Sequence, residues 1–150
     1  MTPTPSATPT PAPSSLTNEQ KQEIVDLARS LIGIRYVYAN MSPETGFDCS
    51  GFTSYIYLTL FDIRLPRTAR SQASAGIAVS SSEIEIGDIL CFDWYNNDGI
   101  CDHVGLYVGD GKYIHASSSD RTYYLDSGAV KESIVNFSRN PIISIRRIIH

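Results

Sequence analysis

Phe47-Asp48-Cys49-Ser50-Gly51-Phe52 is the stretch from which the fold can be worked out. Apolar residues at helical spacing follow it, so a helix is expected from about residue 49 to 61. Asp48 is then the N-cap, because its carboxylate accepts unpaired N–H groups of the first turn. Cys49 lies in that turn, where the helix dipole favours the thiolate, the nucleophilic form. The alternative is that Cys49 is a small buried apolar residue, as free cysteines usually are.

A cysteine nucleophile needs a base, and the chain holds three histidines. His150 is the last residue, which leaves His103 and His115 as candidates. If they cooperate, Cys49 attacks a carbonyl carbon. His103 takes the thiol proton, or holds the ion pair, and later protonates the leaving amine. Neutral His115 accepts a hydrogen bond from His103 and fixes its tautomer. For each histidine alone, a structural role is the alternative.

Whether the two histidines can cooperate depends on the hairpin predicted to join them. A two-residue turn at Asp110-Gly111 places them on opposite faces of the sheet, because side chains alternate along a strand. A three-residue loop over residues 109–111, with its last glycine in the left-handed conformation, puts Gly105 opposite His115 instead. His103 and His115 are then diagonal neighbours on one face, about 7–8 Å apart.

Composition limits the partners and the architecture. The chain has 150 residues, 42% of them hydrophobic, which suits one compact domain. Its net charge is −4 and no basic run occurs, which argues against nucleic acid and anionic membrane surfaces as partners. No apolar segment approaches the ~20 residues that span a bilayer, and no signal peptide follows Met1.

Residues 1–16 are rich in Pro, Thr and Ser and are predicted to be an extended, disordered linker. Residues 17–150 are predicted to form the folded domain. A tether at the very start of a chain suggests a fragment of a longer, exported protein, so further modules are expected upstream of it.

The order of the predicted elements indicates the fold class. Thr17 and Gln20 form a capping-box pattern that opens a helix, and Gly33 is placed to end it. Thr68 is expected to cap a short helix through Gln72. The second half is predicted to form short strands near Ile84 and Ile86 and over residues 89–92, 104–108, 113–115, 123–125 and 142–149. Helices followed by strands predict an α+β domain with an antiparallel sheet.

Taken together, these residues resemble the NlpC-type bacterial cell-wall cysteine peptidases. The resemblance covers about residues 20–150 and implies a compact papain-like fold, with N-terminal helices packed on an antiparallel sheet of about five to six strands. The matching pieces occur in the family's order and spacing: Leu31-Ile32-Gly33 with Tyr36, Phe47 to Phe52, Leu65-Pro66-Arg67 with Gln72, Gly87-Asp88, His103-Val104-Gly105, Gly109-Asp110-Gly111 and His115-Ala116.

The resemblance implies a secreted or wall-associated cysteine endopeptidase without cofactor or metal. Its substrate is then peptidoglycan or a muropeptide, and the hydrolysed amide typically joins γ-D-glutamate to the following diamino acid, diaminopimelate or lysine. Carried over residue by residue, Cys49 is the nucleophile, His103 the base and His115 the orienting third member.

The resemblance also extends to the surroundings of the thiol. Tyr36 is similar to a family tyrosine whose hydroxyl lies near the nucleophile and helps to hold the oxyanion. The backbone N–H of Cys49 is the other natural oxyanion donor. Asp48 and Ser50 flank the thiol and are expected to contact the substrate. One departure is Tyr38-Ala39-Asn40, where the family shows an aromatic residue and two glycines; this loop borders the cleft and bears on substrate preference and cleft width.

Other interpretations remain open at this point. Cys91 and Cys101 flank one hairpin and form either a disulfide, which leaves Cys49 as the free thiol, or two buried thiols. Together with both histidines they offer zinc ligands, although without the usual paired spacing. The same scaffold also supports an N-acetylmuramoyl-L-alanine amidase, acyl transfer or a non-catalytic cell-wall-binding module. The loop Asp93 to Cys101 and the tract Ser117 to Glu132 receive no assignment.

Overall fold

The computed structural model describes residues 15–118, 128–137 and 141–150. Within them the chain forms helices α1 (Asn18–Ser30), α2 (Cys49–Phe61) and α3 (Ala69–Gln72), and a 3-10 helix at Ser81–Glu83. Strands β1 (Met41–Ser42) and β2 (Gly46–Phe47) pair with each other. The main sheet comprises β3 (Ile77–Ala78), β4 (Ile89–Phe92), β5 (His103–Gly109), β6 (Lys112–Ser117), β7 (Ala129–Ile134) and β8 (Ile142–Arg147). It is antiparallel, in the order β3-β8-β4-β5-β6-β7.

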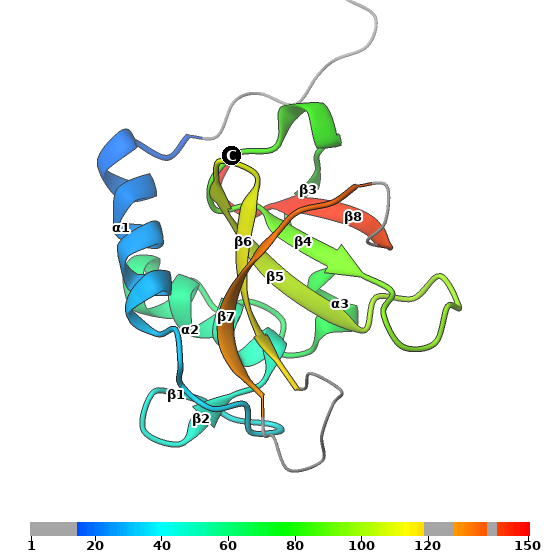
Figure 1. The fold of residues 1–150 in the computed structure, drawn as a ribbon. Helices are drawn as coiled ribbons and strands as arrows, with labels where there is room; N and C mark the ends of the chain where they lie inside the picture. Colours follow the sequence, from blue (N-terminus) through cyan, green and yellow to red (C-terminus); the bar gives the residue numbers. More distant parts are fainter. Residues whose placement is uncertain (1–14, 119–127, 138–140) are drawn as a thin grey trace, which may run out of the picture.

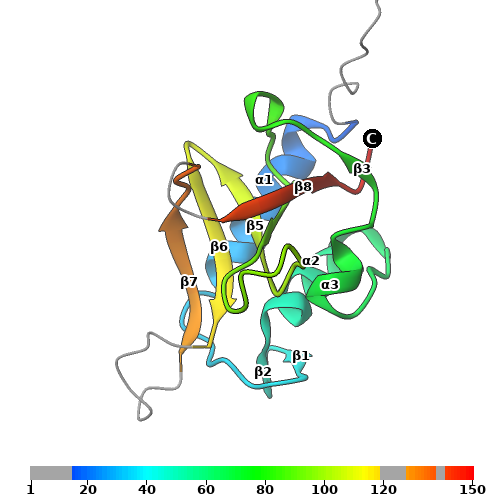
Figure 2. The same cartoon turned by 90° about the vertical axis from the view of Figure 1, so that its right-hand side faces the viewer.

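The helices and the sheet form two layers. α1 and α2 lie beside each other against one face of the main sheet (Figures 1 and 2). The main core fills the space between these helices and the strands, and a smaller cluster covers the opposite face, built from Val79, Leu90, Phe92, Tyr113 and Ile145. The six strands and the packed helices confirm the predicted α+β class.

Both predicted starts of the long helices are confirmed. Thr17 and Gln20 form the capping box of α1. Asp48 caps α2, and its carboxylate accepts the backbone N–H of Gly51 at 2.6 Å. Because a side chain satisfies each first turn, the helix starts are fixed by local sequence. α1 ends before Gly33, which follows it in a left-handed conformation with φ 98°.

Two further predictions concern the ends of short segments. Thr68 caps α3 as expected, and α3 ends at Gln72. Of the predicted linker, residues 1–14 lie outside the described residues. Leu16, its last residue, is 8% exposed and packs in the main core, so the buried part of the chain begins before the first helix.

The strand predictions are confirmed in part. The strand predicted near Ile84 and Ile86 is wrong, because the carboxylate of Asp88 accepts the backbone N–H of Glu85 at 2.8 Å and holds this segment in a turn. β7 is a strand that the sequence does not predict, and the strand predicted over 123–125 lies outside the described residues. The strands predicted over 89–92, 104–108, 113–115 and 142–149 correspond to β4, β5, β6 and β8.

The tip of the β5–β6 hairpin differs from the predicted three-residue loop. Gly109 pairs with Lys112, so the turn itself consists of Asp110 and Gly111, both with positive φ, 54° and 73°. Gly111 is left-handed as predicted. A two-residue turn alone would place the histidines on opposite faces.

A bulge restores the predicted register below the tip. The pairing shifts between Tyr107 and Gly109, so that Tyr107 pairs with Tyr113. Continued along the strands, this register puts Gly105 opposite His115, and a Cβ added at Gly105 would lie 3.3 Å from the Cβ of His115. The extra residue in the bulge therefore turns His103 and His115 to the same face.

Candidate active site

His103 and His115 form a buried hydrogen-bonded pair. His103 Nε2 lies 2.7 Å from His115 Nδ1, and each side chain is 1% exposed. The hairpin geometry thus brings together the two histidines that the sequence predicts as base and third member. Since Nε2 of His103 faces His115, Nδ1 is the ring nitrogen left to act on a thiol.

Cys49 lies against the strand that carries His103. It is the first residue of α2, which packs on both β5 and β6. The backbone N–H groups of Val104 and Ser50 donate to the Cys49 sulfur. Val104 directly follows His103, so the candidate nucleophile lies beside the start of the strand that carries the candidate base.

The resting state of the Cys49 sulfur differs from the prediction. Burial raises the pKa of the Cys49 thiol to about 11, and the charge of Asp48 acts in the same direction. The hydrogen bonds from Val104 and Ser50 lower the pKa but do not offset the burial. The N–H of Ser50 in the first turn favours the thiolate as expected, but burial outweighs this effect and favours the thiol in the free protein.

Burial also keeps both histidines neutral. It is the main cause that lowers the pKa of His103 well below its ordinary value; repulsion from His115 when that ring is protonated and from the charge of Lys131 acts in the same direction. Burial, followed by the charge of Lys131, lowers the pKa of His115 to about 3. The shifts of all three groups therefore favour a neutral thiol and two neutral imidazoles at neutral pH.

Trp94 is a neighbour of the histidines that the sequence does not assign. Its ring stacks on His103 with 3.9 Å between centroids, and it meets His115 edge-on at 5.4 Å. The Asp102 carboxylate accepts the backbone N–H groups of Trp94 at 2.7 Å and Tyr95 at 2.8 Å, which fixes the loop. Trp94 lies in an irregular loop, where no periodic pattern indicates which way a side chain points.

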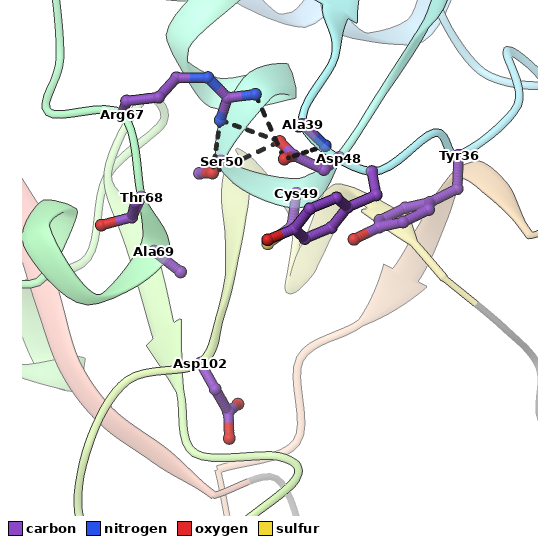
Figure 3. A pocket seen from close by; sticks show the side chains of 10 residues that line it. Tyr36, Ala39, Asp48, Cys49, Ser50, Arg67, Thr68, Ala69 and Asp102 are labelled. Atoms are coloured by element: carbon purple, nitrogen blue, oxygen red, sulfur yellow. Dashed lines mark hydrogen bonds and ion pairs between the residues drawn. The ribbon is translucent and has the colours of Figure 1, made fainter.

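A pocket of about 430 Å³ opens beside Cys49 (Figure 3). Its lining includes all of the predicted residues around the thiol, and neither histidine: Tyr36, Tyr38, Ala39, Asp48, Cys49, Ser50, Arg67, Thr68, Ala69 and Asp102. In Figure 3, Tyr36 and Arg67 lie on opposite sides of Cys49. The thiol is therefore reached through this pocket, while the histidines are covered.

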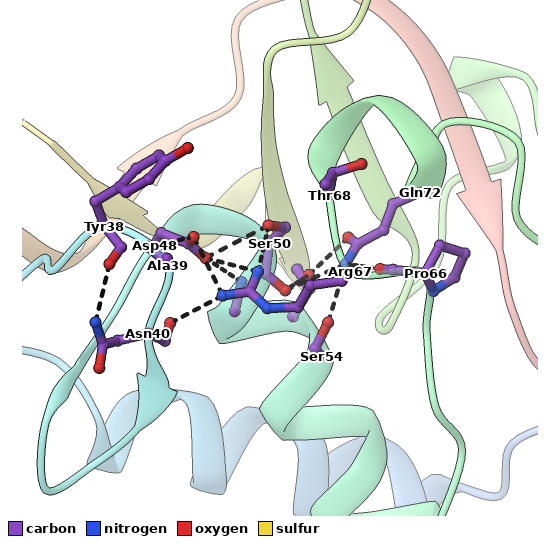
Figure 4. A network of polar contacts seen from close by, with 12 residues as sticks. Tyr38, Ala39, Asn40, Asp48, Ser50, Ser54, Pro66, Arg67, Thr68 and Gln72 are labelled. Carbon is purple, nitrogen blue, oxygen red and sulfur yellow. Dashed lines mark hydrogen bonds and ion pairs between the residues drawn. The ribbon is translucent and has the colours of Figure 1, made fainter.

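Asp48 holds three segments together beside the thiol (Figure 4). Its two oxygens accept hydrogen bonds from the two terminal nitrogens of Arg67, at 3.1 and 3.2 Å. They also accept the backbone N–H of Ala39 at 3.0 Å and that of Gly51. Arg67 further donates to Ser50 Oγ at 2.9 Å. Asp48 is thus committed to internal contacts, and the charge of Arg67 balances it at the pocket wall.

Gln72 fixes the turn that carries Arg67. Its side chain is fully buried; its amide nitrogen donates to the carbonyl of Pro66 at 2.9 Å and of Ser50 at 3.2 Å. Its amide oxygen accepts the hydroxyl of Thr53 at 2.7 Å. Since α3 and α2 are joined in this way, the Leu65-Pro66-Arg67 turn is held against the start of α2.

Tyr36 lines the same pocket as Cys49. Burial, and then the charges of Cys49 and Asp48, raise the pKa of the Tyr36 hydroxyl, so it stays protonated and can donate a hydrogen bond. In the neighbouring loop Tyr38 is 82% exposed and Ala39 has φ 64°, a conformation that favours glycine. The departure from the family pattern therefore places an alanine in a glycine-type conformation at the pocket wall.

Cys91 and Cys101 are free and buried. Of the two alternatives, a disulfide or a pair of buried thiols, the structure therefore has the pair of buried thiols. They are hydrogen-bonded to each other, and the Cys101 sulfur also donates to the carbonyl of His103 at 3.4 Å.

Among the described residues no three His, Cys, Asp or Glu side chains are placed to hold one metal ion. In the same part of the chain no helix is both long and apolar enough for a bilayer span.

The fold is the papain-like α+β fold of the NlpC/P60 proteins, and comparison with a solved structure shows this directly. A crystal structure of an NlpC/P60 family protein from Bacillus cereus superposes with a TM-score of 0.74 at 28% identity, over 95% of this chain and 42% of that one. Residues 33–139 match the NlpC/P60 family, and the chain belongs to it.

Two curated relatives carry more specific names. The chain is 34% identical over 132 residues to the gamma-DL-glutamyl hydrolase of Bacillus subtilis, which covers 81% of this chain and 32% of that protein. It is 36% identical over 114 residues to the gamma-D-glutamyl-L-lysine dipeptidyl-peptidase of Bacillus cereus, covering 76% of this chain and 31% of that protein. The chain thus spans about a third of the length of these relatives.

Proposed function

We propose that this chain is the catalytic domain of a cysteine endopeptidase that hydrolyses peptidoglycan stem peptides between γ-D-glutamate and the following diamino acid. The observation that carries the proposal is the His103–His115 pair next to Val104, whose N–H donates to the Cys49 sulfur. The names of two relatives, which both specify γ-glutamyl substrates, support the choice of bond.

In the proposed reaction, His103 Nδ1 takes the thiol proton as the Cys49 sulfur attacks the γ-carbonyl carbon. Because burial raises the pKa of Cys49 and lowers that of His103, we expect proton transfer to accompany attack, without an ion pair formed beforehand. The backbone N–H of Cys49 and the Tyr36 hydroxyl donate to the oxyanion. His103 then protonates the leaving amine of the diamino acid, which leaves a thioester on Cys49.

Water completes the cycle. His103 removes a proton from a water molecule that attacks the thioester, and the thiol is regenerated as the γ-D-glutamyl carboxylate leaves. His115 orients His103 throughout. On the substrate side, Asp48 and Ser50 line the pocket next to the sulfur, where the acyl part of the stem peptide has to lie.

Mass spectrometry of purified muropeptides tests the reaction and the nucleophile together. The wild type is expected to split the stem after γ-D-glutamate, and Cys49→Ala is expected to keep the fold and to release nothing. His115→Asn is expected to retain partial activity, because an amide oxygen still accepts the hydrogen bond from His103. Turnover by Cys49→Ala would refute the assignment of the nucleophile.

The same digest separates the alternatives. Release of whole stems from the sugar identifies an N-acetylmuramoyl-L-alanine amidase, and transfer of the acyl group to an added amine identifies acyl transfer. Binding to cell walls without any cleavage identifies a wall-binding module. In that case the first variant to test replaces Ala39 and Asn40, in the Tyr38-Ala39-Asn40 loop, by the two glycines of the family pattern.

A wall substrate sets the location and the context that we propose. The enzyme acts outside the cytoplasm, secreted or wall-associated, with the Pro/Thr/Ser-rich residues before Leu16 as a tether to other modules. The composition of that segment supports the tether. Cell fractionation with an antibody against residues 17–150 tests the location.

A further inference from the structure

Ser133 on β7 contacts the ring nitrogen of His115 that does not face His103. The β6–β7 ladder pairs His115 with Lys131 and Tyr113 with Ser133, so Lys131 and Ser133 are the β7 neighbours on the face of His115. Ser133 Oγ lies 3.1 Å from His115 Nε2. On the other side of the same ring, His115 Nδ1 lies 2.7 Å from His103 Nε2. The contacts form a continuous chain from Ser133 to His103.

The tautomer of His115 decides whether His103 can act as a base. A neutral imidazole carries one N–H and one acceptor nitrogen. If His115 carries its proton on Nε2, its Nδ1 accepts from Nε2–H of His103, and Nδ1 of His103 is free to take a proton. If His115 carries its proton on Nδ1, it donates to His103 Nε2. The proton of His103 then sits on Nδ1 and blocks proton transfer from Cys49.

The productive tautomer needs an acceptor for its Nε2–H. His115 is buried, and a buried N–H without a partner is unfavourable. Ser133 Oγ is positioned to be this acceptor, whereas the ammonium of Lys131 on the same face has no lone pair to offer. The same hydroxyl can donate to Nε2 in the other tautomer, so it supports the productive tautomer where His115 Nδ1 has to accept. This acceptor is needed most when His103 is protonated. Both nitrogens of His103 then donate, so His115 Nδ1 has to accept and the proton of His115 has to stay on Nε2.

We infer that Ser133 is a positioning residue, whose hydroxyl accepts the Nε2–H of His115 and so stabilises the tautomer that His115 has to hold when His103 Nδ1 takes the Cys49 proton. The inference rests on the proposed function for its link to catalysis. Its structural part, the tautomer of His115, can be measured without any substrate.

Nitrogen NMR of the ¹⁵N-histidine-labelled protein measures the tautomer directly, since only three histidines contribute signals. In the wild type His115 is expected to be protonated on Nε2 and His103 on Nε2. In Ser133→Ala the His115 signals are expected to shift toward the Nδ1–H form, whereas Ser133→Thr, which keeps the hydroxyl, is expected to retain the wild-type pattern. Ser144→Ala, another half-buried serine in a strand of this sheet, serves as the control.

Kinetics on the muropeptide give the second readout. Ser133→Ala is expected to lower kcat about 10-fold with little change in KM, because it alters proton transfer and not the pocket. Ser133→Thr is expected to recover most of that loss. Wild-type tautomers and wild-type kcat in Ser133→Ala would overturn the inference. If the wild type cleaves no muropeptide, the proposed function fails, and the NMR result still decides whether Ser133 sets the tautomer.

Discussion

The indole of Trp94 lies parallel to the imidazole of His103, with 3.9 Å between the ring centroids and 12° between the planes. Asp102 anchors the backbone of Trp94, so the stack is held from outside the sheet. The stacked ring covers one face of the imidazole and limits its rotation. It therefore links an irregular loop to the protonation and the orientation of the proposed base.

Trp94→Ala is expected to move the acid limb of the pH–rate profile. Burial is the main cause of the low pKa of His103, so exposure to water raises this pKa toward its ordinary value of 6.5. The rise of kcat/KM that follows deprotonation of the base then occurs at higher pH. Profiles of kcat/KM on a muropeptide measure the shift. Trp94→Phe and Ile100→Ala in the same loop are the controls, and an acid limb that stays in place in Trp94→Ala would contradict this role.

Alkylation of Cys49 is expected to become faster with pH well beyond neutrality. Because burial raises the pKa of the thiol to about 11, the thiolate fraction still increases tenfold per pH unit at pH 8. Iodoacetamide labelling followed by peptide mass spectrometry measures the rate at this residue, with Cys49→Ala as the blank. A rate that levels off near neutral pH would indicate a preformed ion pair with His103 and would disprove the neutral resting state.

The parts of the site that follow from local sequence could be predicted. Asp48 caps α2 through a carboxylate three residues from its partner Gly51, and such a contact depends only on neighbouring residues. The common face of His103 and His115 also follows from parity once one extra residue is counted at the hairpin tip. The location of that residue, a bulge next to a two-residue turn, was not predictable, because both loop types use the same glycines.

The parts that depend on distant segments could not be predicted. Ser133 reaches His115 only through the register between β6 and β7, and β7 shows no clear alternation of apolar residues. Burial of Cys49 depends on packing against β5, which outweighs the helix-start effect that the sequence indicates. The strand predicted at Ile84 fails for the opposite reason, since a single carboxylate, that of Asp88, turns the chain.

Gly105→Ala is expected to impair both stability and turnover. The added Cβ would lie 2.7 Å from Cδ2 of Tyr113 and close to His115, so the side chains beside the histidine pair have to move. Overpacking of this kind destabilises a fold by about 1–3 kcal/mol. Urea denaturation and kcat measure the two effects. Tyr113→Leu in the same chain makes room and is expected to restore part of the lost stability; a Gly105→Ala protein with wild-type stability and kcat would rule out this packing constraint.

Acid is expected to destabilise the fold through the buried histidines. His115 titrates at about 3 in the folded chain and near 6.5 when unfolded. Between these pH values the unfolded chain binds the additional proton, so the free energy of unfolding falls as pH falls; above about 6.5 both states are neutral and the effect disappears. One such histidine contributes a slope of about 1.4 kcal/mol per pH unit, and His103, whose pKa is also lowered, adds to it.

Urea denaturation between pH 7 and pH 4 measures this slope. His115→Asn removes one titrating group and is expected to flatten the pH dependence, even though its stability at pH 7 also changes. The exposed terminal histidine supplies the matched control, because His150→Asn leaves both buried rings in place. The comparison is made between slopes and not between stabilities. An identical slope in the wild type and in His115→Asn would mean that His115 accepts a proton in the folded protein as readily as in the unfolded chain, against the burial that sets its pKa.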